Sequence, residues 1–134
     1  MKRPTPTIST LIDMSPEERL EFGEWAYANL EHNNFDMDVI RYPRTSMVRV
    51  PGVMYFPVHP VLMLESLAPN PEASDRQRAS AMWDSSQLLD QVSRDTGLQE
   101  QYFLCRDPRL ARLASRHGFT ELKGYTVLRK KVKQ

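Results

Sequence analysis

Residues 61–81 decide the fold, and they read VLMLESLAPNPEASDRQRASA. The continuous apolar run Val61–Leu64 predicts a short strand that is buried on both faces. A polar loop follows, and Ser74 or Asp75 can cap a helix that runs to about Thr96. This stretch therefore predicts a buried strand that leads into a long helix. The buried side of this helix is expected at Met82, Trp83, Leu88, Leu89 and Val92.

The residues after this helix predict a second crossover and a strand-rich end. Glu100–Cys105 predicts a strand, and a strand–helix–strand connection makes its two strands parallel neighbours. Asp107 and the proline after it start a short helix that ends at Gly118. Two final strands are expected at Phe119–Leu122 and Tyr125–Val132.

The first half of the chain predicts one helix and a set of hairpins. Residues 1–12 are expected to be extended, and Ser15-Pro16-Glu17-Glu18 starts a helix that runs to about His32. Short strands follow at Asp38–Tyr42, Ser46–Val50 and Val53–Phe56. The element order predicts a single α/β domain over residues 1–134, with a mixed, mostly antiparallel central sheet flanked by helices.

Composition and charge limit the class of protein. The chain is 40% hydrophobic and 26% charged, as in ordinary globular proteins, and it has no apolar run long enough to span a membrane. A single cysteine, Cys105, and the absence of a signal-peptide pattern indicate a reducing, cytoplasmic setting. No His, Cys, Asp or Glu residues have the spacing of metal ligands.

The last part of the chain is basic. Residues 106–134 hold nine Lys or Arg against two Asp or Glu, which favours anionic partners or marks a solvated basic edge strand. Aromatic residues are not interleaved with these basic ones, so nucleic-acid binding is disfavoured.

The start of the long helix is the candidate binding site. A helix entered from a buried strand presents free backbone N–H groups and the positive end of its dipole, which together bind phosphate. The residues there combine positive charge with small side chains that allow a diphosphate to approach: Arg76, Arg78, Ala79, Ser80 and Ala81.

The element order, Arg76-x-x-Ala79-x-Ala81 and Gly118-Phe119 together resemble the GNAT superfamily of N-acetyltransferases, whose turn Arg/Gln-x-x-Gly-x-Gly/Ala holds the acyl-CoA pyrophosphate. The resemblance implies acetyl-CoA as the cofactor and an amine as the acceptor. It implies the following roles: residues 76 and 78–81 at the pyrophosphate, the backbone of Leu67 and Ala68 along the pantetheine arm, and Glu65 as the base that takes the amine proton through water.

Two positions depart from the family pattern. Ala79 replaces the central glycine, and Ala114 stands where the family commonly has a tyrosine that protonates the leaving thiolate. Losing a placed acid typically costs about 10²–10⁴ in rate. Two functions therefore stay open. One is an acyl-CoA-dependent N-acetyltransferase. The other is a non-catalytic interaction module with a protein partner or a homo-oligomer, for example a regulatory domain or a tailed-phage virion component.

Overall fold

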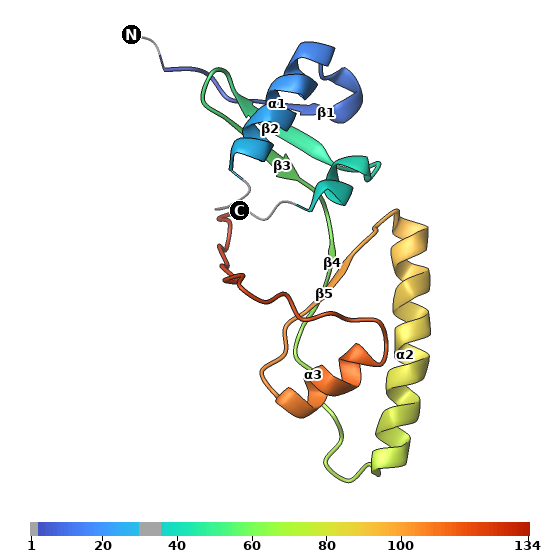
Figure 1. The fold of residues 1–134 in the computed structure, drawn as a ribbon. Helices are drawn as coiled ribbons and strands as arrows, with labels where there is room; N and C mark the ends of the chain where they lie inside the picture. Colours follow the sequence, from blue (N-terminus) through green and yellow to red (C-terminus); the bar gives the residue numbers. More distant parts are fainter. Residues whose placement is uncertain (1–2, 30–35) are drawn as a thin grey trace. The chain divides into compact units, whose positions relative to one another are not determined.

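The computed structural model describes residues 3–29 and 36–134, which belong to two compact units. Helix α2 (Asp75–Thr96), which is labelled in Figure 1, belongs to both units, since residues 75–89 fall in unit 2 and residues 90–96 in unit 1. Unit 1 comprises Met1–Met63 and Asp90–Tyr102, and unit 2 comprises Leu64–Leu89 and Phe103–Gln134.

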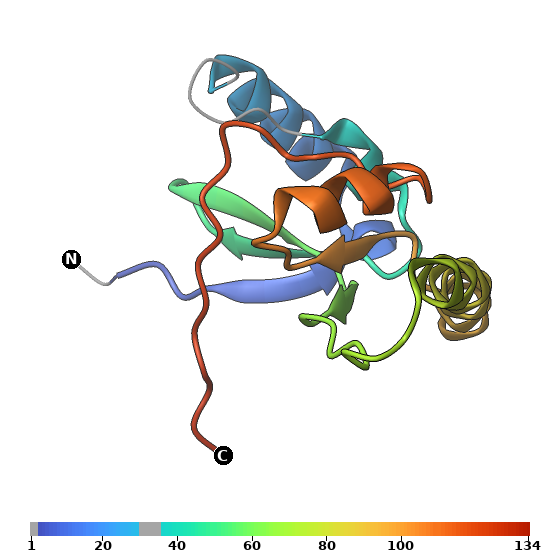
Figure 2. The same ribbon diagram turned by 90° about the horizontal axis from the view of Figure 1, so that it is seen from below.

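Unit 1 is built on a three-stranded antiparallel sheet with the strand order β1-β2-β3. The predicted hairpin joins β2 and β3, and Gly52 in its turn has a φ of 72°, a conformation that glycine adopts without steric cost. A helix, α1, lies against one face of this sheet (Figure 2). The elements are β1 (Thr7–Thr10), η1 (Leu11–Asp13), α1 (Pro16–Ala28), η2 (Met37–Arg41), β2 (Ser46–Val50) and β3 (Met54–Val58).

The start of α1 confirms the sequence prediction. The Ser15 hydroxyl accepts from the backbone N–H of Glu18, and the Glu18 carboxylate accepts from that of Ser15. This capping box fixes the helix end locally. The helix then buries Phe22 and Ala26 against Met47 of β2, which is 1% exposed, to form the core of unit 1.

A two-stranded sheet joins β4 (Leu62–Leu64) and β5 (Gln101–Phe103). The Leu62 N–H donates to the Glu100 carbonyl at 3.1 Å within unit 1, and the Leu104 N–H donates to the Leu64 carbonyl at 3.1 Å within unit 2. Partners advance in the same direction on both strands, which confirms the predicted parallel pair. The predicted burial of the first strand on both faces is wrong, because Met63 is exposed.

Two helices of the second half also begin where predicted. Ser74 caps α2, and the Asp107 side chain accepts from the N–H of Arg109 at the start of α3 (Pro108–Ser115). The less exposed positions of α2 follow the helical repeat, at residues 78, 82, 86, 89 and 93. Trp83 and Leu88, which the sequence suggests are buried, lie outside this stripe and are exposed.

Several predicted strands are wrong. The segment predicted as a strand at Asp38–Tyr42 is the 3-10 helix η2, because the Asp36 side chain caps it by accepting from the N–H of Asp38. Residues 119–134 form no strand, and their apolar side chains are mostly exposed. The strands form two small sheets rather than one central sheet. Helix α1 ends at Ala28, and the rest of its predicted range falls largely outside the described residues.

Candidate functional site

The start of α2 is closed by side chains of the chain itself. The Ser74 backbone N–H donates to Oε1 of Gln77 at 2.8 Å, and the Gln77 N–H donates to Oγ of Ser74 at 3.1 Å. These bonds form a second capping box and use two of the N–H groups that a phosphate would need. Asp75 adds a carboxylate at the first helical position, where it interacts favourably with the helix dipole and repels an anion.

Arg78 binds the loop that precedes this helix. Its Nη2 donates to the carbonyl oxygens of Asn70 and Pro71 at 3.0 and 3.1 Å, and its Nη1 lies 4.0 Å from a carboxylate oxygen of Asp75. The guanidinium thus fixes the loop to the first turns of α2. Arg76 is exposed and is the more accessible of the two predicted pyrophosphate-binding arginines.

The small residues of the predicted turn lie inside the helix. Ala79, Ser80 and Ala81 are exposed, but α2 begins at Asp75, so their N–H groups fall in the hydrogen-bonded interior of the helix. They form an exposed helical surface in place of an open phosphate-binding turn. Their assignment to CoA binding stays a prediction.

The predicted base and the predicted pantetheine contacts lie in an exposed segment. Glu65 follows β4 directly, and it is exposed, as are Leu67 and Ala68. This stretch has no regular secondary structure. The structure therefore places Glu65 at the end of the predicted strand, and its role in proton transfer stays a prediction.

Ala114, at the position of the family's tyrosine, is buried within unit 2 and only 5% exposed. Its carbonyl oxygen accepts from the N–H groups of His117 and Phe119 at 2.9 and 3.3 Å, which ends α3. The segment after the helix packs through rings, with Phe119 6.0 Å from Phe103 and His117 5.9 Å from Trp83 between centroids. Because Ala114 is buried, a larger side chain at this position has to displace its surroundings.

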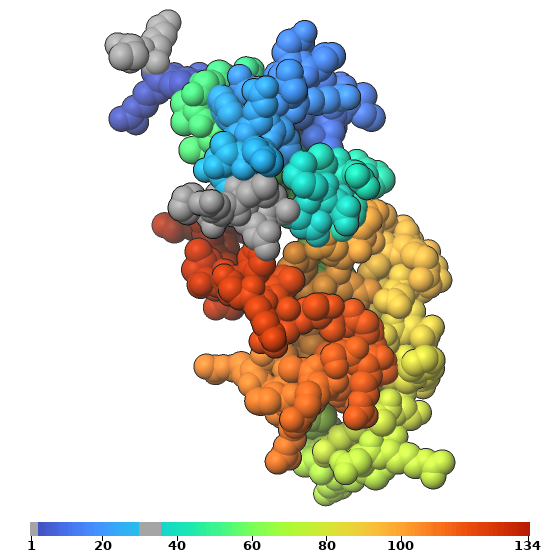
Figure 3. Space-filling view, viewed as in Figure 1, coloured from blue at the N-terminus to red at the C-terminus, as the bar shows by residue number. Residues whose placement is uncertain are grey.

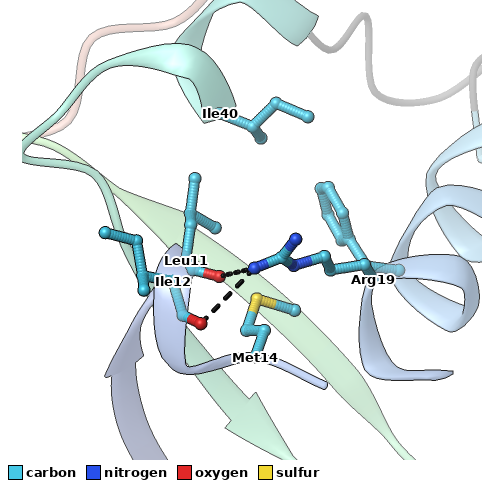
Figure 4. A pocket seen from close by; sticks show the side chains of 6 residues that line it. Leu11, Ile12, Met14, Arg19 and Ile40 are labelled. Carbon is cyan, nitrogen blue, oxygen red and sulfur yellow. Dashed lines mark hydrogen bonds between the residues drawn. The ribbon is translucent and has the colours of Figure 1, made fainter. Parts of the chain in front are cut away.

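A pocket that the sequence does not predict opens in unit 1 beside the core. Its volume is about 280 Å³, and Figure 4 shows the Arg19 guanidinium at its wall, donating to the carbonyl oxygens of Leu11 and Ile12 at 2.8 and 3.4 Å. Arg19 therefore fixes η1 against α1. The lining is mostly apolar: Leu11, Ile12, Met14, Arg19, Phe22 and Ile40.

Unit 1 also contains a polar cluster that is centred on Glu100. Its carboxylate accepts from the phenol of Tyr42 at 2.6 Å and from that of Tyr102 at 3.0 Å. The hydrogen bond to Glu100, together with burial, raises the pKa of Tyr42 well above its usual range. The bond between Tyr42 and Glu100 connects the end of η2 to the residue that precedes β5. No sequence signal marks this pair, because its members lie 58 residues apart.

Among the described residues, no group of three or more His, Cys, Asp or Glu side chains gathers to hold a metal ion. None of the helices in the described part of the chain is both long and apolar enough to cross a membrane. Comparison of the chain with protein families, with curated proteins and with solved structures gives no match. The resemblance to the GNAT superfamily therefore rests on residues and element order alone.

Proposed function

We propose that this chain is a non-catalytic module with a GNAT-like element order, and that it acts by binding protein surfaces. The observation that carries the proposal is the exposure of its apolar side chains. Five apolar side chains are buried among the described residues, whereas nineteen large ones are exposed. Single exposed apolar residues are ordinary, but contiguous apolar surfaces mark interaction sites.

Helix α2 illustrates this exposure. The helix lies at the surface in the space-filling view (Figure 3), and Trp83 and Leu88 on it are 58% and 64% exposed. Tryptophan is enriched at the energetic centres of protein interfaces because its ring buries a large area at a low cost in side-chain entropy. A protein partner on this helix removes that area from water.

The start of α2 supports a non-catalytic reading. Its capping box and the Arg78 contacts occupy donors that the acyl-CoA pyrophosphate requires. Ala114 supplies no proton donor. Binding of CoA through this turn requires the chain to break its own hydrogen bonds, each of which contributes about 1 kcal/mol.

An acyl-CoA-dependent N-acetyltransferase is the alternative. It is favoured by the parallel pair β4–β5, by the crossover helix α2 between these strands, and by the position of Glu65 directly after β4. In this alternative, Glu65 takes the proton of the attacking amine through water, and the exposed Arg76 binds the pyrophosphate.

Titration calorimetry with acetyl-CoA separates the two functions. We expect no heat of binding up to about 1 mM ligand, the limit of ordinary weak affinity. Two-dimensional NMR in the same titration should show no shift of the amide signals of residues 65–81. Saturable binding that is lost in Arg76→Ala, and retained in Arg106→Ala outside the turn, contradicts the proposal and favours the acetyltransferase.

A further inference from the structure

The sheet of unit 1 has a covered face and an open face. Met47 and Tyr55 lie on the covered face: Met47 enters the core, and the Tyr55 ring lies 5.7 Å from that of Phe22, with its hydroxyl donating to Glu21 at 2.8 Å. Side chains alternate along each strand, so the neighbours of these residues point to the other face.

The open face is the more apolar of the two. On β3, exposure alternates so that Met54, Phe56 and Val58 are exposed while Tyr55 and Pro57 are half-buried. On β1, Ile8 is exposed and Ser9 is half-buried. This pattern is the reverse of a sheet with one solvated face, on which the exposed positions are polar.

The register joins these residues into one surface. Ile8 pairs with Val48, which in turn pairs with Phe56 across the sheet, so the three form a row. Ile8 is 66% exposed and Phe56 is 61% exposed. The open face is formed by Ile8, Thr10, Ser46, Val48, Val50, Met54, Phe56 and Val58.

We infer that this open face is the contact between two copies of the chain, packed sheet on sheet. None of its eight strand positions is charged. In a two-fold interface the same surface of each copy forms the contact, so a charged residue near the axis lies opposite the same charge on the other copy. A face without charges avoids this repulsion and can pack against itself. Two apolar sheets pack face to face at about 10 Å, as in a β-sandwich.

The area agrees with a weak dimer. The exposed apolar side chains of the open face bury roughly 500 Å² per copy, or about 1,000 Å² in a pair, which is near the lower limit for a specific interface. An area of this size leaves little surplus after the entropy cost of association, so we expect the contact at micromolar rather than nanomolar concentrations. This inference rests on the proposed function, since it names the partner for one of the interaction surfaces.

Sedimentation equilibrium between about 1 and 200 µM tests the contact. The wild-type chain should associate to a dimer. Phe56→Lys should weaken self-association by about 30-fold or more, because it removes an aromatic anchor and brings two like charges together. Leu20→Lys is the matched control: Leu20 is similarly exposed but lies on α1, and this change should leave the dimer intact.

Ile8→Lys on the opposite edge strand provides a second variant if Phe56→Lys fails to fold, with folding checked by circular dichroism. Amides of β2 and β3 should exchange with deuterium more slowly as the wild-type concentration rises. A wild-type chain that is monomeric at 200 µM, or lysine variants that are folded and still dimeric, overturn the inference. If the chain is monomeric and does not bind acetyl-CoA, only the proposed dimer is refuted. If the chain binds acetyl-CoA, the proposed function itself is refuted.

Discussion

Introducing the glycine and the tyrosine of the GNAT pattern at positions 79 and 114 should destabilise the chain without creating a CoA site. Ala79 lies on the exposed surface inside α2, so Ala79→Gly costs about 1 kcal/mol in helix propensity. Ala114 is buried at 5% exposure, so Ala114→Tyr forces a ring into a packed position at a cost of about 1–3 kcal/mol. The double variant should therefore lose about 2–4 kcal/mol, a large share of the usual 5–15 kcal/mol of unfolding free energy.

Urea unfolding followed by circular dichroism measures this loss, and acetyl-CoA calorimetry on the same samples measures binding. Ala111→Tyr is the matched control, because it makes the same change at an exposed position one turn earlier in α3. It should cost only a few tenths of a kcal/mol. Equal stability of Ala114→Tyr and Ala111→Tyr, or binding of acetyl-CoA by the double variant but not by the wild type, would contradict this prediction.

Two further changes test the hydrogen bonds that shape the units. The raised pKa of Tyr42 means that the unfolded chain loses this proton first, so the free energy of unfolding should fall as pH rises above about 10. Tyr42→Phe should lower the free energy of unfolding by about 1 kcal/mol at pH 7, because it removes the bond to Glu100. The same variant should show a smaller loss of stability above pH ~10 than the wild type does. Urea unfolding at neutral and at alkaline pH measures both effects, and the control Tyr27→Phe should show neither. Ser74→Ala should lower the free energy of unfolding by about 1 kcal/mol, because the helix loses its cap. Ser80 is exposed in the same helix, so Ser80→Ala is the control and should be neutral or slightly stabilising. Equal effects of the two variants would contradict the capping role of Ser74.

Part of the candidate site was predictable because it depends on residues that are close together in the sequence. Ser74 or Asp75 was expected to cap α2, and Ser74 does. The glutamine three residues later was a further signal, since Ser-x-x-Gln is a capping-box pattern, and it explains why the helix start is closed. The contacts of Arg78 with the Asn70 and Pro71 carbonyls had no such signal, because they depend on how the loop folds back.

The predicted order of elements agrees with the structure from β2 to α3, and the errors lie outside that range: β1 was expected only as an extended segment, η2 as a strand, and residues 119–134 as two strands. The bounds of β2 were predicted correctly, the predictions for β3, β4 and β5 overlap the observed strands, and the parallel relation of the last two was also correct. The segment after Phe119 was misassigned because strand propensity forms a strand only when a partner edge is available. Trp83 and Leu88 were expected to be buried because they are apolar, but both are exposed. Helix α2 has more apolar residues than fit on one stripe, and tertiary packing selects which of them lie on it.

The sequence by itself determined where α1, α2 and α3 begin and the approximate positions of β2 to β5, because caps, turns and side-chain alternation act over a few residues. Only the tertiary structure decided that the strands divide into two sheets and that α1 covers the face of Met47 and Tyr55. Both faces of that sheet carry apolar residues, so alternation alone does not select the covered one. The choice depends on contacts between segments far apart in the chain, and it leaves the face of Ile8 and Phe56 open.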